Sequence, residues 1–189
     1  MKPDPERDGI VKSFDGFNSY LAIVDAFTRY TWIFPCRSKH PPVDLIDLFL
    51  KKNGIPAGGM VRTDLGGELA RSHAFCKKLA DHNYIIEPTG PDAAVQNSGV
   101  ERFNGSFAEI TRSLLYGAGL PAIYWSSALV HAAFLLNRRC HSRTKKTPFE
   151  SWNGKRPNLK HVVLCCCCFL MLLLLTYIDF VALCCCFAL

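Results

Sequence analysis

The alternation of apolar and polar positions predicts a β-hairpin followed by a helix in the first third of the chain. Residues 20–25 and 30–36 are rich in apolar, aromatic and β-branched side chains and are separated by a short polar turn, which is typical of an antiparallel hairpin. Apolar residues then recur at helical spacing from Val43 to Phe49, behind two prolines and ahead of two lysines. Gly54 follows, so we expect this helix to stop there.

The middle of the chain alternates short strands with helices. Residues 60–64 and 84–88 are each a short β-prone run, and residues 72–83 between them form an amphipathic segment with Ser72 as its expected N-cap. Residues 89–99 are polar and rich in turn formers, which favours a loop. A hairpin followed by strands that alternate with helices predicts an α/β layered domain with a mixed sheet.

Two helices are predicted after this loop. The first carries an apolar stripe whose members are three and four residues apart, namely Val100, Phe103, Phe107, Ile110 and Leu114. Glu101 then lies one residue into this helix, beside the stripe, at the rim of the sheet on which the helix packs. Residues 117–121 break the pattern, and a second helix is expected from Pro121 to Arg139 with Trp125 and Leu129 directed inward. Trp32 and Trp152 are also expected to be packing residues.

Positive charge is concentrated towards the end of the polar part of the chain. The 189 residues carry 22 Lys and Arg against 16 Asp and Glu, a formal net charge of +6. Between residues 138 and 160 the only acid is Glu150, and the bases are Arg138, Arg139, Arg143, Lys145, Lys146, Lys155, Arg156 and Lys160. This stretch fits a nucleic-acid phosphate footprint and fits a solvated surface segment equally well.

The last 28 residues differ sharply from the rest. Seven of the ten cysteines lie in two homopolymer runs within residues 162–189, which are strongly apolar and hold one charge, Asp179. The length suits a transmembrane helix, but runs of Cys and Leu this uniform favour translated low-complexity DNA. The other three cysteines show no pairing framework, so a reducing intracellular setting is expected. The polar opening, residues 1–10, is unlike a signal peptide.

One short stretch has the composition of a metal and phosphate site. Asp64 ends the β-prone run 60–64, Gly66 and Gly67 follow, and Glu101 is 37 positions further on. Paired carboxylates hold divalent cations, and glycines allow a phosphate to approach closely, although Asp and Gly are equally ordinary turn residues. A zinc site from His73, Cys76 and His82 with Cys36 has no template spacing, and Glu68 is better explained as a solvated loop residue.

Five blocks, in order, carry a resemblance to a known family. They are YLAIVDAFTRYTWIFP, VRTDLGGELARS, QNSGVERFNGSFAEITRSLL, YWSSALVHAAFLLNR and KTPFESWNGKRPNL, which together lie within residues 9–160. The chain resembles the integrase catalytic core of copia-type LTR retrotransposons, in the ribonuclease H-like superfamily. The resemblance implies a three-layer α/β fold in which helices flank a mixed sheet.

The same resemblance implies the site. In that family three carboxylates (D, D, E) hold two Mg²⁺ or Mn²⁺ ions for attack by water or a DNA 3′-hydroxyl on a phosphodiester. By motif, Asp64 is the second aspartate and Glu101 is the glutamate. Asn97, Arg102 and Asn104 match a block close to bound DNA, and we expect Arg138, Arg139, Lys145 and Lys146 to contact DNA as well. The implied partners are element-end and target DNA and further copies of the chain, in the nucleus or a cytoplasmic particle.

The chain departs from the family pattern at the first aspartate. Asp25 follows the block that matches the family's second strand, whereas the first catalytic aspartate belongs to the strand before it. Nothing in residues 1–14 has the pattern of that strand, so we expect it to be missing and the chain to be inactive alone. The expected organisation is a polar start (1–19), the core (20–140), a basic extension (141–161) and the apolar tail (162–189). A nucleic-acid-binding remnant and a small tail-anchored membrane protein stay open as alternatives.

Overall fold

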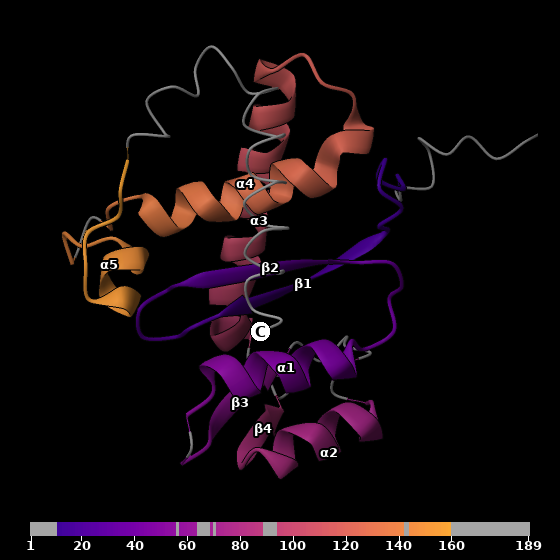
Figure 1. Ribbon diagram of the computed structural model, residues 1–189, viewed down its shortest axis with the longest axis vertical. Helices are drawn as coiled ribbons and strands as arrows, with labels where there is room; N and C mark the ends of the chain where they lie inside the picture. The colour runs from indigo at the N-terminus through magenta and orange to yellow at the C-terminus, as the bar shows by residue number, and fades with distance from the viewer. Residues whose placement is uncertain are drawn as a thin grey trace, which may run out of the picture. The chain divides into compact units, whose positions relative to one another are not determined.

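The computed structural model describes residues 11–55, 57–63, 69, 71–88, 94–141 and 144–159, with the backbone alone for residues 88 and 94–104 (Figure 1). By compactness the chain divides into a first unit, Met1–Pro35 with Ser106–Leu189, and a second unit, Cys36–Gly105. The elements in chain order are β1 (Ser19–Val24), β2 (Thr31–Cys36), α1 (Val43–Asn53), β3 (Gly59–Thr63), α2 (His73–Asp81), β4 (Tyr84–Pro88), α3 (Ala94–Gly117), η1 (Ala122–Tyr124), α4 (Trp125–Arg138) and α5 (Pro148–Asn153).

In the first unit, β1 and β2 pair as the expected hairpin. Their connection is too short for a crossover, so the two strands are antiparallel. The backbone amide of Asp25 donates to the carbonyl of Tyr30 at 2.9 Å, and Arg29 closes the turn in a left-handed conformation with φ 64°. The hairpin prediction is confirmed.

Helix α4 is fixed to strand β2 by one buried side-chain amide. Asn137 accepts a hydrogen bond from the Thr31 backbone N–H and donates one to the Thr31 carbonyl, each at 2.8 Å. Both residues are almost fully buried, with 5% and 3% of their surface exposed. Asn137 therefore satisfies two backbone groups that water cannot reach. The apolar core of the unit consists of Leu21, Ile33, Phe107, Leu115, Ala128, Leu129, Ala132 and Ala133.

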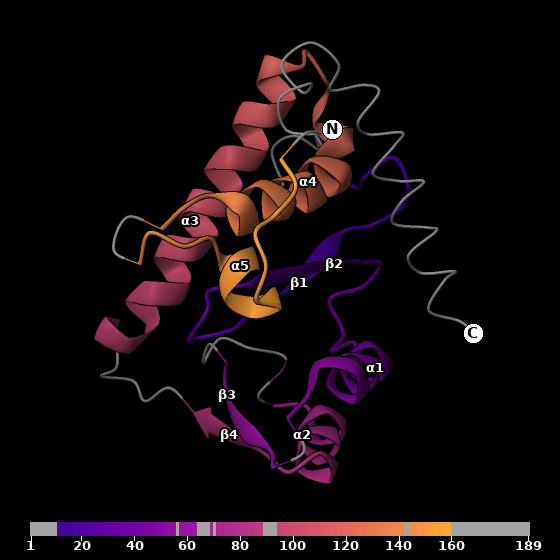
Figure 2. The same ribbon diagram turned by 60° about the vertical axis from the view of Figure 1, so that its left-hand side comes forward.

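The short helix α5 lies beside the hairpin, as Figures 1 and 2 both show. Trp152 packs edge-on against Trp32 with ring centroids 4.8 Å apart, and Tyr30 lies 4.7 Å from Trp32. The sequence patterns above did not predict α5, although its caps are legible in the sequence. The Thr147 hydroxyl accepts from the Glu150 N–H at 3.0 Å, Pro148 opens the helix, and Gly154 ends it with φ 69°.

The second unit is built on a parallel pair of strands. β3 pairs with β4 in register from Gly59 opposite Tyr84 to Thr63 opposite Pro88. Helix α2 connects them and packs on β4 and on α1. The Ser72 hydroxyl caps α2 by accepting from the Phe75 N–H at 3.3 Å, which confirms the predicted N-cap. Among the side chains of this unit that the structure describes, the buried apolar ones are Ile46, Leu50, Phe75 and Leu79.

One expectation needs correction. Helix α3 begins at Ala94, so residues 94–99 are helical rather than loop, and Glu101 is the eighth residue of the helix rather than the second. Asn97, Ser98 and Gly99 have low helix propensity, so the sequence favoured a loop here. Helix propensity is a weak guide where the surrounding structure favours a helix. The described strands pair within each unit as one antiparallel and one parallel two-stranded sheet, and the single mixed sheet with three layers stays a prediction. The α/β class is confirmed.

The side-chain amide of Asn137 is expected to contribute strongly to stability. Replacing it in Asn137→Ala leaves the buried N–H and carbonyl of Thr31 unpaired, which costs about 3 kcal/mol of unfolding free energy. Urea unfolding measures this loss. The control is Asn153→Ala, whose amide donates to Phe149 on the exposed surface of α5 at 3.0 Å and should cost about 0.5 kcal/mol or less. Equal losses in the two variants would contradict the anchoring role of Asn137.

Candidate active site at the carboxyl edge of β3 and β4

The parallel pairing of β3 and β4 defines the edge at which a site is expected. Thr63 and Pro88 are the last residues of the two strands and lie opposite each other in the register. Both chain segments therefore leave the sheet from one edge, which is the edge where ligands bind in open α/β sheets. Asp64 follows Thr63 directly, and α3 begins six positions after Pro88.

The predicted residues of this site fall into two groups: some are carried by α3, and others lie outside the described residues. Asp64 and Glu68 belong to the latter group. Helix α3 carries four of the predicted residues, Asn97, Glu101, Arg102 and Asn104. Positions 97, 101 and 104 are four and three residues apart, so they share one side of the helix. Their roles in metal and DNA binding stay predictions.

The Asp25 side chain accepts hydrogen bonds from within its own turn. Its Oδ2 accepts hydrogen bonds from the backbone N–H and the hydroxyl of Thr28, both at 2.6 Å. The Thr28 hydroxyl in turn accepts from the Tyr30 N–H at 3.2 Å. A carboxylate with this arrangement stabilises the hairpin turn. The expectation that Asp25 is not the first catalytic aspartate stays a prediction.

The structure separates the predicted DNA-contact residues of the first unit into two kinds. The guanidinium of Arg138 lies 3.5 Å from the ring centre of Phe134 and 4.9 Å from that of Phe149. Its Nε is buried without a hydrogen-bond partner among the described residues, and burial lowers the pKa of the group, an effect that nearby Tyr30 opposes. By contrast, Arg139, Lys145 and Lys146 are exposed. Arg138 therefore packs, whereas the other three present charge to solvent.

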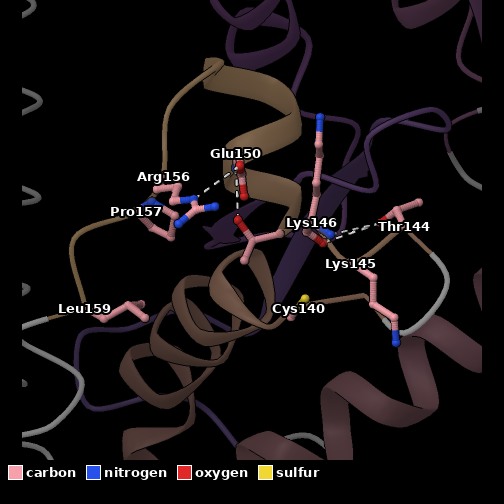
Figure 3. A pocket seen from close by; sticks show the side chains of 9 residues that line it. Cys140, Thr144, Lys145, Lys146, Glu150, Arg156, Pro157 and Leu159 are labelled. Carbon is pink, nitrogen blue, oxygen red and sulfur yellow. Dashed lines mark hydrogen bonds and ion pairs between the residues drawn. The ribbon is translucent and has the colours of Figure 1, made fainter.

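A hollow of about 390 Å³ opens beside these lysines, and the sequence patterns did not identify it (Figure 3). It is lined by Cys140, Thr144, Lys145, Lys146, Thr147, Glu150, Arg156, Pro157 and Leu159. Within this lining, Arg156 Nε lies 3.8 Å from Glu150 Oε1. The T-x-x-E capping pattern at Thr147 marks the start of α5, next to the hollow, but no sequence pattern locates the hollow itself.

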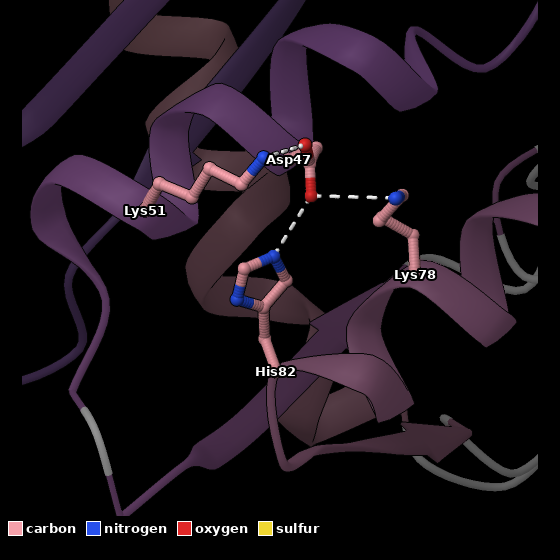
Figure 4. A network of polar contacts seen from close by, with 4 residues as sticks. All are labelled: Asp47, Lys51, Lys78 and His82. Atoms are coloured by element: carbon pink, nitrogen blue, oxygen red, sulfur yellow. Dashed lines mark hydrogen bonds and ion pairs between the residues drawn. The ribbon is translucent and has the colours of Figure 1, made fainter.

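A second charged cluster joins α1 to α2 in the second unit (Figure 4). Asp47 Oδ2 lies 2.7 Å from Lys51 Nζ, while its Oδ1 lies 2.9 Å from His82 Nε2 and 3.4 Å from Lys78 Nζ. Hydrogen bonds from Lys51 and then His82 hold the pKa of the Asp47 carboxyl well below its usual range. His82, a candidate zinc ligand by residue type, thus contacts a carboxylate that ties two helices together.

Among the side chains that the structure describes, no three His, Cys, Asp or Glu residues come together as a metal-ligand group. Asp64 and Glu101 are not among those side chains. The helices of the described ranges are all too short or too polar to cross a bilayer. The apolar tail, residues 162–189, lies outside the described residues.

Comparisons with known proteins agree with the motifs. No family model matches the chain. The retrovirus-related Pol polyprotein of transposon RE2 from Arabidopsis thaliana is 31% identical over 153 residues, which is 78% of this chain and 10% of that protein. The corresponding polyprotein of transposon TNT 1-94 from Nicotiana tabacum is 26% identical over 80% of this chain and 12% of its own length. The chain thus spans about a tenth of these relatives.

Solved structures give the fold. A chain of the simian T-cell lymphotropic virus intasome, in complex with a PP2A regulatory subunit, matches 79% of this chain and 53% of its own length with a TM-score of 0.62 and 17% identity. The HTLV-2 integrase catalytic core domain, solved with magnesium in a trimeric form, matches 74% of this chain and 88% of its own with a TM-score of 0.54 and 17% identity.

The fold and the relatives together place the protein in a class. Its structural neighbours include a chain of a retroviral intasome and a retroviral integrase catalytic core, and its homologues are retrotransposon Pol polyproteins. The resemblance drawn from the five sequence blocks is therefore confirmed: the chain belongs to the retrovirus-related Pol polyproteins of transposons, and its fold is that of an integrase catalytic core.

The Asp47 cluster predicts a pH dependence of stability. Because the pKa of Asp47 is lowered in the fold, its carboxylate stabilises the protein fully above the ordinary aspartate pKa of about 3.9 and progressively less as pH falls below it. Asp47→Asn should unfold more easily than the wild type at pH 7, and the gap should narrow from about pH 4 to about pH 2. Thermal unfolding across this range measures it, with exposed Asp44→Asn as control. A gap independent of pH would contradict the assignment.

Proposed function

We propose that this chain is an integrase catalytic-core domain of a copia-type element, a class of domain that joins DNA by metal-dependent phosphodiester strand transfer. The observation that carries the proposal is the topology of the second unit. Asp64 follows β3 directly, and Glu101 is carried on the helix that the chain enters after β4, the parallel partner of β3. Both residues therefore come from elements that leave the same edge of a sheet.

The carboxylates of this edge fit a hard divalent cation. Asp64 and Glu101 would hold Mg²⁺ or Mn²⁺, which prefer oxygen ligands. Bound there, the metal supplies charge for the attacking and leaving oxygens of an in-line displacement. Support for magnesium comes from the HTLV-2 core, which was solved with that ion. The glycines at positions 66 and 67 would let a phosphate approach closely, and Asn97, Arg102 and Asn104 would position the DNA.

The third carboxylate of the family's site is not supplied by Asp25 in this proposal, because both hydrogen bonds to its Oδ2 come from Thr28 within its own turn. We therefore assign two carboxylates of the site, Asp64 and Glu101, and expect strand transfer only where a third carboxylate completes them. A function limited to nucleic-acid binding is the second candidate, and it is favoured by the exposure of Arg139, Lys145 and Lys146.

The metal proposal is tested by Mn²⁺ binding, which does not depend on activity. Water-proton relaxation should detect a saturable Mn²⁺ site on the full chain. Asp64→Asn and Glu101→Gln should each weaken it by about tenfold or more, since even outer partners of a metal ligand are worth that much. Asp44→Asn, an exposed acid on α1, should leave the binding unchanged.

Two results would contradict the metal proposal. One is Mn²⁺ binding that survives both substitutions with unchanged affinity. The other is an equal loss in Asp44→Asn, which would mean that the ion responds to general negative charge rather than to two specific ligands.

The DNA proposal is tested by salt dependence. Each cation that contacts a phosphate adds about one to the slope of log affinity against log salt. Changing Arg139, Lys145 and Lys146 together to glutamine should therefore lower that slope by about three. Arg138→Gln is the matched control, because its guanidinium packs on Phe134 and Phe149. It should reduce stability and leave the slope nearly unchanged, and a slope that drops equally in both variants would refute this division of roles.

A further inference from the structure

The lining of the hollow beside α5 combines apolar, positively charged and hydroxyl side chains. Cys140, Pro157 and Leu159 contribute apolar surface, and Leu159 keeps 47% of its surface exposed. Lys145, Lys146 and Arg156 contribute three positive charges against the single carboxylate of Glu150. The hydroxyls of Thr144 and Thr147 complete the lining. The lining therefore offers a small apolar surface beside a group of positive charges.

The cations do not converge on one point. In Figure 3 the side chains of Lys145 and Lys146 extend in different directions, and Pro157 and Leu159 lie on the opposite side of the hollow from Thr144 and Lys145. Glu150 lies between these sides, and Arg156 contacts it at 3.8 Å. A single phosphate would meet separated cations and a carboxylate that repels it. An extended ligand whose apolar part lies toward Pro157 and Leu159 and whose negative charge lies toward Lys145 and Lys146 would meet complementary groups.

Hydrogen-bonding capacity also distinguishes a peptide ligand from a nucleic-acid ligand. A phosphodiester offers only acceptors, whereas a peptide offers backbone N–H donors as well. Glu150 is an acceptor with 24% of its side chain exposed. Its carboxylate can accept a hydrogen bond from a peptide N–H, whereas a phosphodiester has no donor to offer it. The apolar lining can receive a branched side chain, for which a nucleic-acid backbone has no counterpart.

We propose that this hollow binds a short acidic peptide segment of a protein partner, with one or two branched apolar side chains against Pro157 and Leu159 and its carboxylates near Lys145 and Lys146. This goes beyond the proposed DNA chemistry and does not depend on it. Because Lys145 and Lys146 are also proposed to contact DNA, a single-stranded oligonucleotide is the rival occupant.

Fluorescence anisotropy on the full chain tests the proposal with defined probes. The first probe is a labelled peptide EDLIDE, and it is compared with EDSSDE, which lacks the apolar centre, with KKLIKK, which reverses the charge, and with a twelve-nucleotide oligothymidylate. EDLIDE should bind saturably, and both altered peptides should bind about tenfold more weakly or not at all.

Variants then locate the site. Leu159→Ser and the pair Lys145→Gln with Lys146→Gln should each weaken EDLIDE binding by about tenfold. The matched controls are Leu48→Ser, whose leucine is 68% exposed on α1, and Lys77→Gln, an exposed lysine on α2. Both controls should bind as the wild type does, and equal urea midpoints should show that all variants are folded.

Three results would overturn the proposal. If no peptide binds, the hollow has no such partner. If EDSSDE and the oligonucleotide bind as well as EDLIDE, the surface responds to negative charge alone. If Leu159→Ser leaves EDLIDE binding unchanged, the peptide binds elsewhere on the chain.

Discussion

The parallel pairing of β3 with β4 constrains where the candidate catalytic residues can lie. A parallel pair requires a crossover, and α2 provides it by packing on β4 and on α1. The crossover brings the ends of both strands to one edge, so that the residue after Thr63 and the chain that leads into α3 leave the sheet together. If the strands were antiparallel, Asp64 and the start of α3 would leave from opposite ends. The proposed site thus depends on this register before it depends on any side chain.

The first unit is organised by a different interaction, the buried amide of Asn137 against the backbone of Thr31. This contact fixes α4 on β2, and the end of α4 carries Arg138 over the rings of Phe134 and Phe149. The basic stretch is thereby divided, because one cation is used in packing while Arg139 and the two lysines stay exposed. A solvated surface segment and a phosphate footprint fit the sequence of that stretch equally well, and the structure supports a mixture of packing and exposed charge.

Much of the fold was predictable from periodicity and caps. The hairpin, the prolines ahead of α1, the glycine after it and the Ser72 cap all follow from local rules, and each is present in the structure. The start of α3 was not predictable, because Asn97, Ser98 and Gly99 favour a loop locally and only the surrounding structure makes this stretch helical. Helix α5 was missed although it has ordinary cap residues at both ends. The two catalytic carboxylates came from the family resemblance and stay a prediction.

The central claim, that Asp64 and Glu101 share one divalent cation, is tested most directly by crystals of the full chain soaked in Mn²⁺. An anomalous difference peak should lie in direct coordination distance of both carboxylates, about 2.2 Å from the nearest oxygen of each. A peak at other acids, or two carboxylates too far apart to reach one ion, would contradict the account.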